Sequence, residues 1–308
     1  MNKTVKILLT IAVIISIAVL LYFLLGRKKS APTADANQQQ VESSEGVSRW
    51  LELPAYREGE KGRFVVTHTA EMGGRIQRNY TLLYDEESLA ALWVAYPLCA
   101  DHVSTGREET WGYDPHIPRN AQTSVSSGYG ASEPTENYPK NFYARGHQIP
   151  NADRSAVPQM QAQTYFSSNM TPQIQNGFNG GIWAKLEAAV RDRIPAGDTL
   201  YVVTGAVFSR SGAHEPVKTI VNKNDSKSLP VPNYYWKALL KVTRSGGQII
   251  DAKTIGFWLP HGDLKGRSYS EYVVSVDQIE QWASVDLFPN LPDALEASAE
   301  AQASLMSF

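Results

Sequence analysis

The N-terminal part of the chain holds a long apolar run, from Ile7 to Gly26 (ILLTIAVIISIAVLLYFLLG). The run contains no charged residue and is about long enough to cross the hydrocarbon core of a bilayer as a helix. A secretory signal sequence usually has a shorter apolar core, so we expect residues 1–26 to be an uncleaved transmembrane helix. The alternative is cleavage after the small residues at 34–36, which would release a secreted protein.

Basic residues flank this run on both sides, with Lys3 and Lys6 before it and 27–29 (RKK) after it. The number of basic residues on each side of the run, taken alone, slightly favours a cytoplasmic location for the rest of the chain. However, the body contains a single cysteine, Cys99, which suits an oxidising compartment. We therefore expect a membrane-anchored protein whose body is exported, either periplasmic or extracellular.

After a polar segment (27–46) that we interpret as a flexible linker, apolar and polar residues alternate as in an α+β domain. Residues 178–194 carry apolar side chains at helical spacing, and Ser275 to Gln278 resembles a capping box that opens a helix through Trp282. Residues 89–98 fit either a helix or a strand. Runs rich in β-branched and aromatic residues predict strands at 63–69, 80–85, 199–205, 234–242, 254–260 and 272–276.

Strands outnumber helices in this pattern, and no repeated βαβ unit is present. We therefore expect one domain over residues 47–293 with a mixed, largely antiparallel β-sheet. Residues 294–308 would form a tail containing a frayed helix. The glycine-, proline- and asparagine-rich residues 105–140 predict a long loop, and such loops within a domain are commonly functional.

Composition and charge exclude several classes of protein. With 43% hydrophobic and 19% charged residues, the chain is neither disordered nor fibrous. A lone cysteine excludes an intrachain disulfide, a zinc finger and a C-x-x-C redox site. The net charge is −2, and the first 30 residues contain basic but no acidic side chains, so the body is acidic. Any surface that binds phosphate must therefore be local.

The segment from Tyr143 to Pro150 (YARGHQIP) carries candidate chemistry. In an extended strand Arg145 and His147 lie on one face, and the intervening Gly146 would let a backbone or a phosphate approach closely. The planar guanidinium of arginine can hold two phosphate oxygens, and histidine can accept a proton near neutral pH. Taken alone, this short motif also fits an ordinary polar turn.

Two further motifs follow, SNMTPQ at 168–173 and FNGGIWAKLE at 178–187. With RGH, they make the chain resemble the DNA/RNA non-specific endonuclease family, and the resemblance covers most of residues 63–293. It implies a catalytic ββα-metal finger, in which a strand with Arg-Gly-His and a Ser-Asn-x-x-Pro-Gln turn precede a helix with Asn at its start and Glu two turns later.

The resemblance also implies individual roles. His147 would be the general base that activates water, and Asn179 would ligate a single Mg²⁺. Glu187 would hold a metal-bound water, Arg145 would contact phosphate, and Asn169 would support the finger at the substrate-binding site. Eight residues of helix separate Asn179 from Glu187, so both can face one site. The simpler alternatives are a helix cap for Asn179 and a solvated helix face for Glu187.

The chain departs from the family pattern at two positions. Ala144 stands where the family commonly has aspartate, which leaves the orientation of Arg145 open. The family also has an arginine shortly before a Trp-x-x-Asp-Pro segment. Here that segment is present from Trp111 to Pro115, but Glu109 precedes it by two positions and Arg107 by four. Arg107 is thus the candidate for stabilising the transition state, if the loop is displaced.

These features together predict a hydrolase, a Mg²⁺-dependent endonuclease that cuts DNA and RNA through phosphate contacts, with Mn²⁺ as a substitute metal. Activity should fall below a pH of about 6.5 if His147 must be neutral. Two alternatives fit the same sequence. One is a catalytically silent, envelope-anchored binding protein. The other is a phosphodiesterase that acts on a substrate other than nucleic acid.

Overall fold

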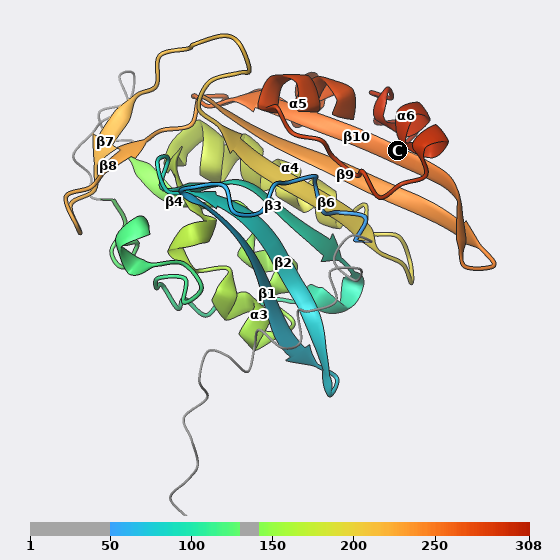
Figure 1. Cartoon of the computed structure of the whole chain (residues 1–308), viewed down its shortest axis with the longest axis horizontal. Helices are drawn as coiled ribbons and strands as arrows, with labels where there is room; N and C mark the ends of the chain where they lie inside the picture. Colours follow the sequence, from blue (N-terminus) through green and yellow to red (C-terminus); the bar gives the residue numbers. More distant parts are fainter. Residues whose placement is uncertain (1–49, 130–141) are drawn as a thin grey trace, which may run out of the picture. The chain divides into compact units, whose positions relative to one another are not determined.

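The core of the fold is a seven-stranded sheet in the order β1-β2-β3-β6-β9-β10-β11, and every neighbouring pair is antiparallel (Figure 1). The computed structural model describes residues 50–129 and 142–308. The sheet strands are β1 (Arg63–Met72), β2 (Arg75–Asp85), β3 (Ala90–Leu98), β6 (Leu200–Val207), β9 (Tyr234–Ser245), β10 (Gln248–Pro260) and β11 (Val273–Val274). The expected α+β class with a largely antiparallel sheet is confirmed.

Two small antiparallel pairs lie outside this sheet, β4 (Tyr143–His147) with β5 (Met170–Ile174) and β7 (Thr219–Val221) with β8 (Ser228–Pro230). The α-helices are α3 (Pro158–Gln163), α4 (Ala184–Arg191), α5 (Val276–Ala283) and α6 (Asp293–Glu300). Short helical turns are η2 (Ala100–His102), η3 (Arg119–Ala121), η4 (Asn151–Arg154), η5 (Ser167–Asn169) and η7 (Tyr269–Tyr272), and η6 (Gln175–Trp183) has wide π-type turns. No helix in the two described ranges is long and apolar enough to cross a bilayer.

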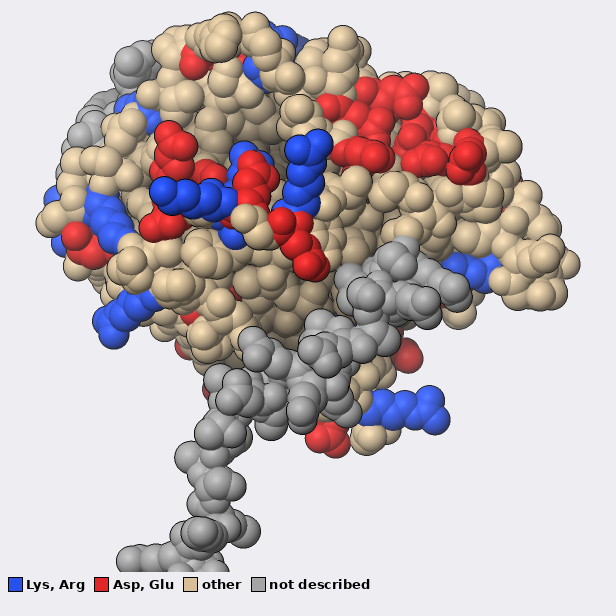
Figure 2. Space-filling model, viewed as in Figure 1, with Lys and Arg blue, Asp and Glu red and all other residues tan. Residues whose placement is uncertain are grey.

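The two faces of the sheet have different coverings. Successive side chains of a strand point to opposite faces, and on one face Tyr235 of β9 packs against Trp183, just before α4. On the other face Trp258 of β10 contacts Trp282 of α5 at a ring-centroid distance of 5.0 Å. Helices α5 and α6 carry acidic side chains on the outer surface of this layer (Figure 2).

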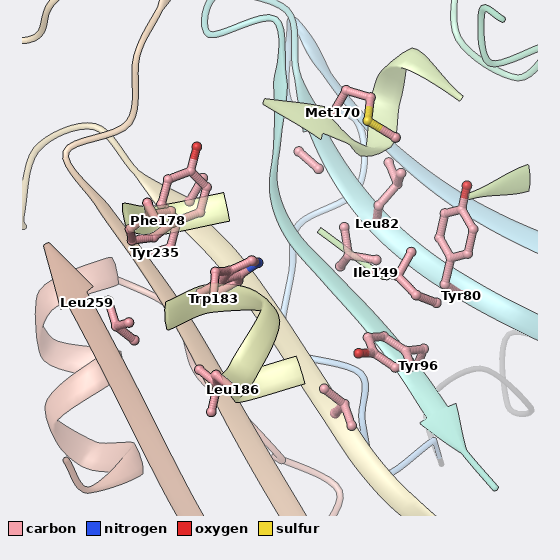
Figure 3. Packing of buried hydrophobic residues seen from close by; sticks show 14 of the residues in the cluster. Tyr80, Leu82, Tyr96, Ile149, Met170, Phe178, Trp183, Leu186, Tyr235 and Leu259 are labelled. Atoms are coloured by element: carbon pink, nitrogen blue, oxygen red, sulfur yellow. The ribbon is translucent and has the colours of Figure 1, made fainter. Parts of the chain in front are cut away.

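The core between the sheet and the β4–β5–α4 region is rich in aromatic side chains, which pack among aliphatic ones (Figure 3). Phe178 stacks on Trp183 with a centroid distance of 5.7 Å, and both rings contact Tyr235. Trp183 is only 1% exposed. It is therefore a core residue, as expected from the sequence, and cannot serve as a platform for stacking bases.

Several sequence-based expectations about elements need correction. Residues 90–98 form a strand, which resolves the earlier ambiguity. The helix expected over 178–194 is regular only from Ala184 to Arg191, because glycines at 177, 180 and 181 favour irregular turns and Gly177 has a φ of +85°. The strand expected at 272–276 ends at Val274, because the Ser275 side chain caps α5 by accepting a hydrogen bond from Gln278.

The other expectations about segments fall into three groups. The helix expected in the tail is present as α6, and its end is packed rather than frayed, since Ala299 is fully buried. In the expected loop, residues 105–129 contain only the short η3 as a helical element. The expected membrane helix (1–26) and linker (27–46) lie outside the described residues.

Candidate functional site

The strands β4 and β5, followed by η6 and α4, have the ββα order that the sequence motifs predict. The pairing register places Arg145 opposite Pro172 and His147 opposite Met170. Gly146 lies between them, and a Cβ atom there would overlap the side chain of Gln173. Glycine is thus required so that Gln173 can pack across the hairpin, and the close approach predicted at Gly146 comes from this side chain rather than from a phosphate.

Asn169 precedes β5 and is fully buried. Its Oδ1 accepts a hydrogen bond from the Ile149 amide at 3.0 Å, and its Nδ2 donates to the carbonyls of Ile149 at 3.0 Å and Thr164 at 2.8 Å. These bonds tie the end of β4 to the start of β5. Asn169 is therefore placed to support the finger, whereas its assignment as a substrate-binding residue stays a prediction.

His147 lies in an aromatic cage. Its ring makes edge-on contacts with Trp111 and Tyr165, at centroid distances of 5.6 and 5.2 Å. Its Nε2 atom is buried and has no hydrogen-bond partner. Burial and the positive charge of Arg107 lower the pKa of His147 to about 3, although a backbone hydrogen bond with Arg145 opposes the shift. The imidazole is therefore neutral at physiological pH, with one nitrogen free to accept a proton.

Arg145 is oriented without the aspartate that the family pattern has at position 144. Its guanidinium carbon lies 3.5 Å from the ring centroid of Trp111, and Nη1 donates a 2.7 Å hydrogen bond to the carbonyl of Val125. Stacking on an indole and a bond to a carbonyl use only part of the donor fork. The remaining N–H groups are available to an anion in the adjacent pocket.

Arg107 and Trp111 are linked through Glu109, which stands where the family pattern has arginine. Arg107 Nε donates to Glu109 Oε1 at 3.0 Å, and Trp111 Nε1 donates to Oε2 at 2.7 Å. The hydrogen bond from Trp111 is the main cause that lowers the pKa of Glu109. The carboxylate therefore fixes the loop that brings Arg107 to the pocket.

A pocket of about 420 Å³ brings three predicted site residues together, Arg107, Arg145 and Asn179. Trp111, which contacts His147, forms part of its wall. Neither His147 nor Glu187 lines this pocket. The remaining lining residues are Ser127, Gly128, Tyr129, Phe142, Tyr143, Ala144 and Gln175.

Asn179 lies within η6 and does not cap the helix, so the simpler alternative for this residue is wrong. Its Nδ2 donates a 2.8 Å hydrogen bond to Gln175 Oε1. This bond fixes the amide plane and leaves Oδ1 as a free oxygen at the pocket wall. A neutral amide oxygen beside open pocket volume suits a hard cation that retains several water ligands, such as Mg²⁺.

Glu187 faces a buried lysine that sequence reasoning missed. Lys237 of β9 is 1% exposed, and its Nζ lies 4.5 Å from the Trp183 ring centroid and 3.2 Å from Thr204 Oγ1. Burial raises the pKa of Glu187 to about 7, while the lysine charge opposes this shift. Burial lowers the pKa of Lys237 to about 8. The sequence feature that could have indicated this buried charge is the position of Lys237 within the apolar run YYWKALLKV.

A second buried pair was also missed. His68 Nε2 lies 2.9 Å from Asp114 Oδ2, and Ser168 Oγ donates to the same oxygen at 2.5 Å. Asp114 belongs to the Trp-x-x-Asp-Pro segment, and Ser168 directly precedes Asn169. The aspartate therefore connects the loop that carries Trp111 to the turn before β5.

Comparison with known proteins agrees with this geometry. The family model described as DNA/RNA non-specific endonuclease matches residues 62–294. The chain belongs to the DNA/RNA non-specific endonuclease family. It is therefore a nuclease of the hydrolase class, as the sequence motifs had predicted.

Relatives in this family cover most of the chain. The nuclease of Serratia marcescens is 28% identical over 239 residues, which are 75% of this chain and 80% of that protein. The nuclease of Nostoc sp. is 26% identical over 232 residues, 74% of this chain and 77% of that protein. A chain in the crystal structure of the EndoG/EndoGI complex shares the fold, with a TM-score of 0.57 and 20% identity, over 75% of this chain and 89% of that chain.

Proposed function

We propose that this protein is a Mg²⁺-dependent, sequence-non-specific endonuclease that hydrolyses phosphodiester bonds in DNA and RNA. The observation that best supports this proposal is the buried, partnerless Nε2 of a neutral His147, next to a pocket lined by two arginines and an amide oxygen. Membership of the endonuclease family supports the substrate class.

His147 acts as the general base in this mechanism. Its neutral ring accepts a proton from the attacking water at Nε2, while the hydrogen bond between the ring and the Arg145 backbone keeps the imidazole oriented. The lowered pKa of the ring, which lies between Trp111 and Tyr165, keeps the proton acceptor uncharged until the reaction begins.

The two arginines hold the scissile phosphate. Arg145 presents the free part of its fork to two nonbridging oxygens, and Arg107 lines the same pocket. Negative charge grows on these oxygens during attack, so the fixed guanidinium groups stabilise the transition state more than the ground state.

Asn179 would hold the metal through Oδ1, and Glu187 would hold it through a water molecule. When bound, Mg²⁺ supplies Lewis-acid stabilisation of the leaving oxygen, and Mn²⁺ can substitute for it. The hydrogen bond from Asn179 Nδ2 to Gln175 positions Asn179 Oδ1 in advance. The charge of Lys237 opposes the rise in the pKa of Glu187.

A second pocket, of about 460 Å³, provides a path for the substrate strand beyond the cleavage site. Different residues of η6 contribute to the two pockets. The second pocket carries Lys185, Lys265 and Arg267. Contacts of this kind to phosphate carry no base information, which is why cleavage should be independent of sequence.

Cleavage of supercoiled plasmid DNA and of RNA, with Mg²⁺ and with chelator, tests the proposal against both alternatives. The endonuclease should cut both substrates with Mg²⁺ and neither with chelator. A silent binding protein would retain nucleic acid without cutting it. A phosphodiesterase for another substrate would hydrolyse a small phosphodiester at a rate that added RNA does not reduce.

For the N-terminal segment we propose that residues 7–26 anchor the protein in a membrane, with the nuclease domain exported. The proposal is supported by the uncharged apolar run and by the single cysteine of the body. Protease added to cells with a permeabilised outer barrier should degrade the domain. Full protection would instead place it in the cytoplasm, as the flanking charges favour.

A further inference from the structure

Three carboxylates converge between α5 and α6, on the face of the sheet opposite α4. Asp277 and Glu280 lie one turn apart on α5, and Glu300 is the last residue of α6. One carboxylate oxygen of each lies within 4.8 Å of those of the other two. Like charges at this separation repel one another, so the arrangement needs a compensating partner.

Glu300 shows that this partner is missing from the protein itself. Glu300 is only 5% exposed, and its Oε1 is buried without a hydrogen-bond partner. Glu280 differs, because its Oε1 accepts a 2.6 Å hydrogen bond from the Leu287 amide. A buried carboxylate oxygen without a donor is costly, and here it belongs to a residue that lies beside two further carboxylates.

The surroundings make the cluster more negative. Asp286, Asp293 and Glu296 lie nearby, and acidic side chains cover this surface (Figure 2). In the part of the chain that the structure describes, no lysine or arginine forms an ion pair with the cluster. Burial and these acidic neighbours raise the pKa of Glu300 to about 9 and that of Glu280 to about 7.

We propose that Asp277, Glu280 and Glu300 form a structural Ca²⁺ site that joins α5 to α6. Three carboxylates can supply up to six hard oxygen ligands, and Ca²⁺ accepts such crowded, partly bidentate sets, whereas Mg²⁺ demands strict octahedral geometry and retains its waters. A bound cation would satisfy the orphan oxygen and neutralise the mutual repulsion. The site does not depend on the proposed nuclease activity.

The ion would hold the C-terminal helix on the sheet. Helix α6 contacts β10 through a 2.7 Å hydrogen bond from Thr254 Oγ1 to the carbonyl of Ala299, the residue before Glu300. Without the cation, repulsion acts directly beside this contact. Calcium should therefore stabilise the fold, because a ligand that binds only the folded state raises its stability.

Thermal unfolding of the full-length protein in a mild detergent, first in EDTA and then with CaCl₂ at pH 8, tests the proposal. Saturating Ca²⁺ should raise the melting midpoint of the wild type by about 5 °C. Glu300→Gln should remove most of this shift and should melt at or above the wild-type temperature in EDTA. Asp277→Asn, which changes an exposed residue, should also reduce the shift without endangering folding.

Two matched controls separate the site from other effects. Asp251→Asn, an exposed carboxylate on β10, should keep the full calcium shift. So should Asn179→Ala, because its metal site lies elsewhere. The proposal fails if wild type shows no shift, if both cluster variants keep it, or if Asn179→Ala alone loses it. An equal shift with MgCl₂ would overturn the assignment to Ca²⁺, and a calcium-insensitive wild type with a stabilised Glu300→Gln would show a shared proton instead.

Discussion

The guanidinium of Arg145 stacks on the indole of Trp111, with 3.5 Å between the guanidinium carbon and the ring centroid. The same indole donates to Glu109, which in turn binds Arg107. One aromatic side chain therefore positions both arginines of the pocket. Arg145 is thus held in place although residue 144 is alanine.

Removing Trp111 should impair phosphate binding less than removing Arg145 itself. Trp111→Ala should lower kcat/KM by about ten-fold, the equivalent of one cation–π contact, because Arg145 loses its stacking partner. Arg145→Ala should cost more, about 10²-fold, because the charge itself is lost. Trp111→Phe keeps an aromatic stacking partner for Arg145 but loses the N–H that binds Glu109, so its loss should be smaller than that of Trp111→Ala. Steady-state cleavage of a labelled oligonucleotide measures all three, and an Arg145→Ala effect no larger than that of Trp111→Ala would contradict the assigned role.

Variants of the three chemical residues should differ in kind. His147→Ala should lose about 10²–10⁴-fold in rate while still binding Mg²⁺ and DNA, because the ring acts on water. Asn179→Ala should need much more Mg²⁺, and Glu187→Ala should be a milder version, since its contact is through water. A Mg²⁺ titration of plasmid cleavage, with DNA binding measured by calorimetry, distinguishes them. Near wild-type cleavage by folded His147→Ala would exclude it as the base.

The pH profile should differ from that of an ordinary histidine. The pKa of His147 is lowered to about 3, so the neutral, active form persists well below the ordinary value of about 6.5. At saturating Mg²⁺ the single-turnover rate should stay nearly flat from pH 7 to pH 5, which revises the limit expected from the sequence alone. A fall centred at 6.5 would show a solvated His147 in the working enzyme.

Stability should nevertheless fall over that range. Unfolded His147 binds a proton below about 6.5 and the folded residue does not, so its contribution is present above 6.5 and is lost as pH falls toward 3. Denaturant unfolding at each pH supplies the control that separates loss of fold from loss of activity. His147→Ala should weaken this pH dependence of stability.

The buried Lys237 should contribute to the stability of the fold because its charge compensates that of Glu187. Lys237→Met leaves the carboxylate with less compensation and should destabilise the fold by about 3 kcal/mol. The double variant Glu187→Gln/Lys237→Met removes both charges and should recover much of that loss. Urea unfolding of the two variants tests the coupling. A double variant no more stable than Lys237→Met would show that the lysine stabilises the fold through other contacts.

The second pocket should be visible in the salt dependence of binding. Each phosphate contact adds about 0.9 to the slope of log affinity against log salt for duplex DNA. Lys185→Ala/Lys265→Ala should therefore lower the slope by about 2, with little change in kcat at saturating substrate. Lys61→Ala/Lys253→Ala removes the same charge from exposed positions away from both pockets and serves as the control. Equal slopes in the two double variants would place the DNA elsewhere.

The sequence predicted the fold class and the ββα order because strands and motifs follow local patterns. It could not show that Gly177 and Gly181 break the expected helix, since helical spacing in the apolar residues continues through them. The burial of Asn169 could not be foreseen, because a motif gives the type of a residue but not its surroundings. Lys237 and His68 were missed because each meets its partner only after distant strands pair.

Strands β3 and β6 pair with each other, with Leu98 opposite Leu200. The sequence between them carries Arg107, His147, Asn179 and Glu187, so this pairing joins two strands that are about a hundred residues apart. Trp183, at the end of η6, also packs on Tyr235 of β9, and β9 follows later still in the sequence. Long-range closure of this kind is slow compared with hairpin formation. A nascent chain should therefore be unable to cut nucleic acid until synthesis has passed β9, and the order of folding itself would delay the appearance of a harmful activity.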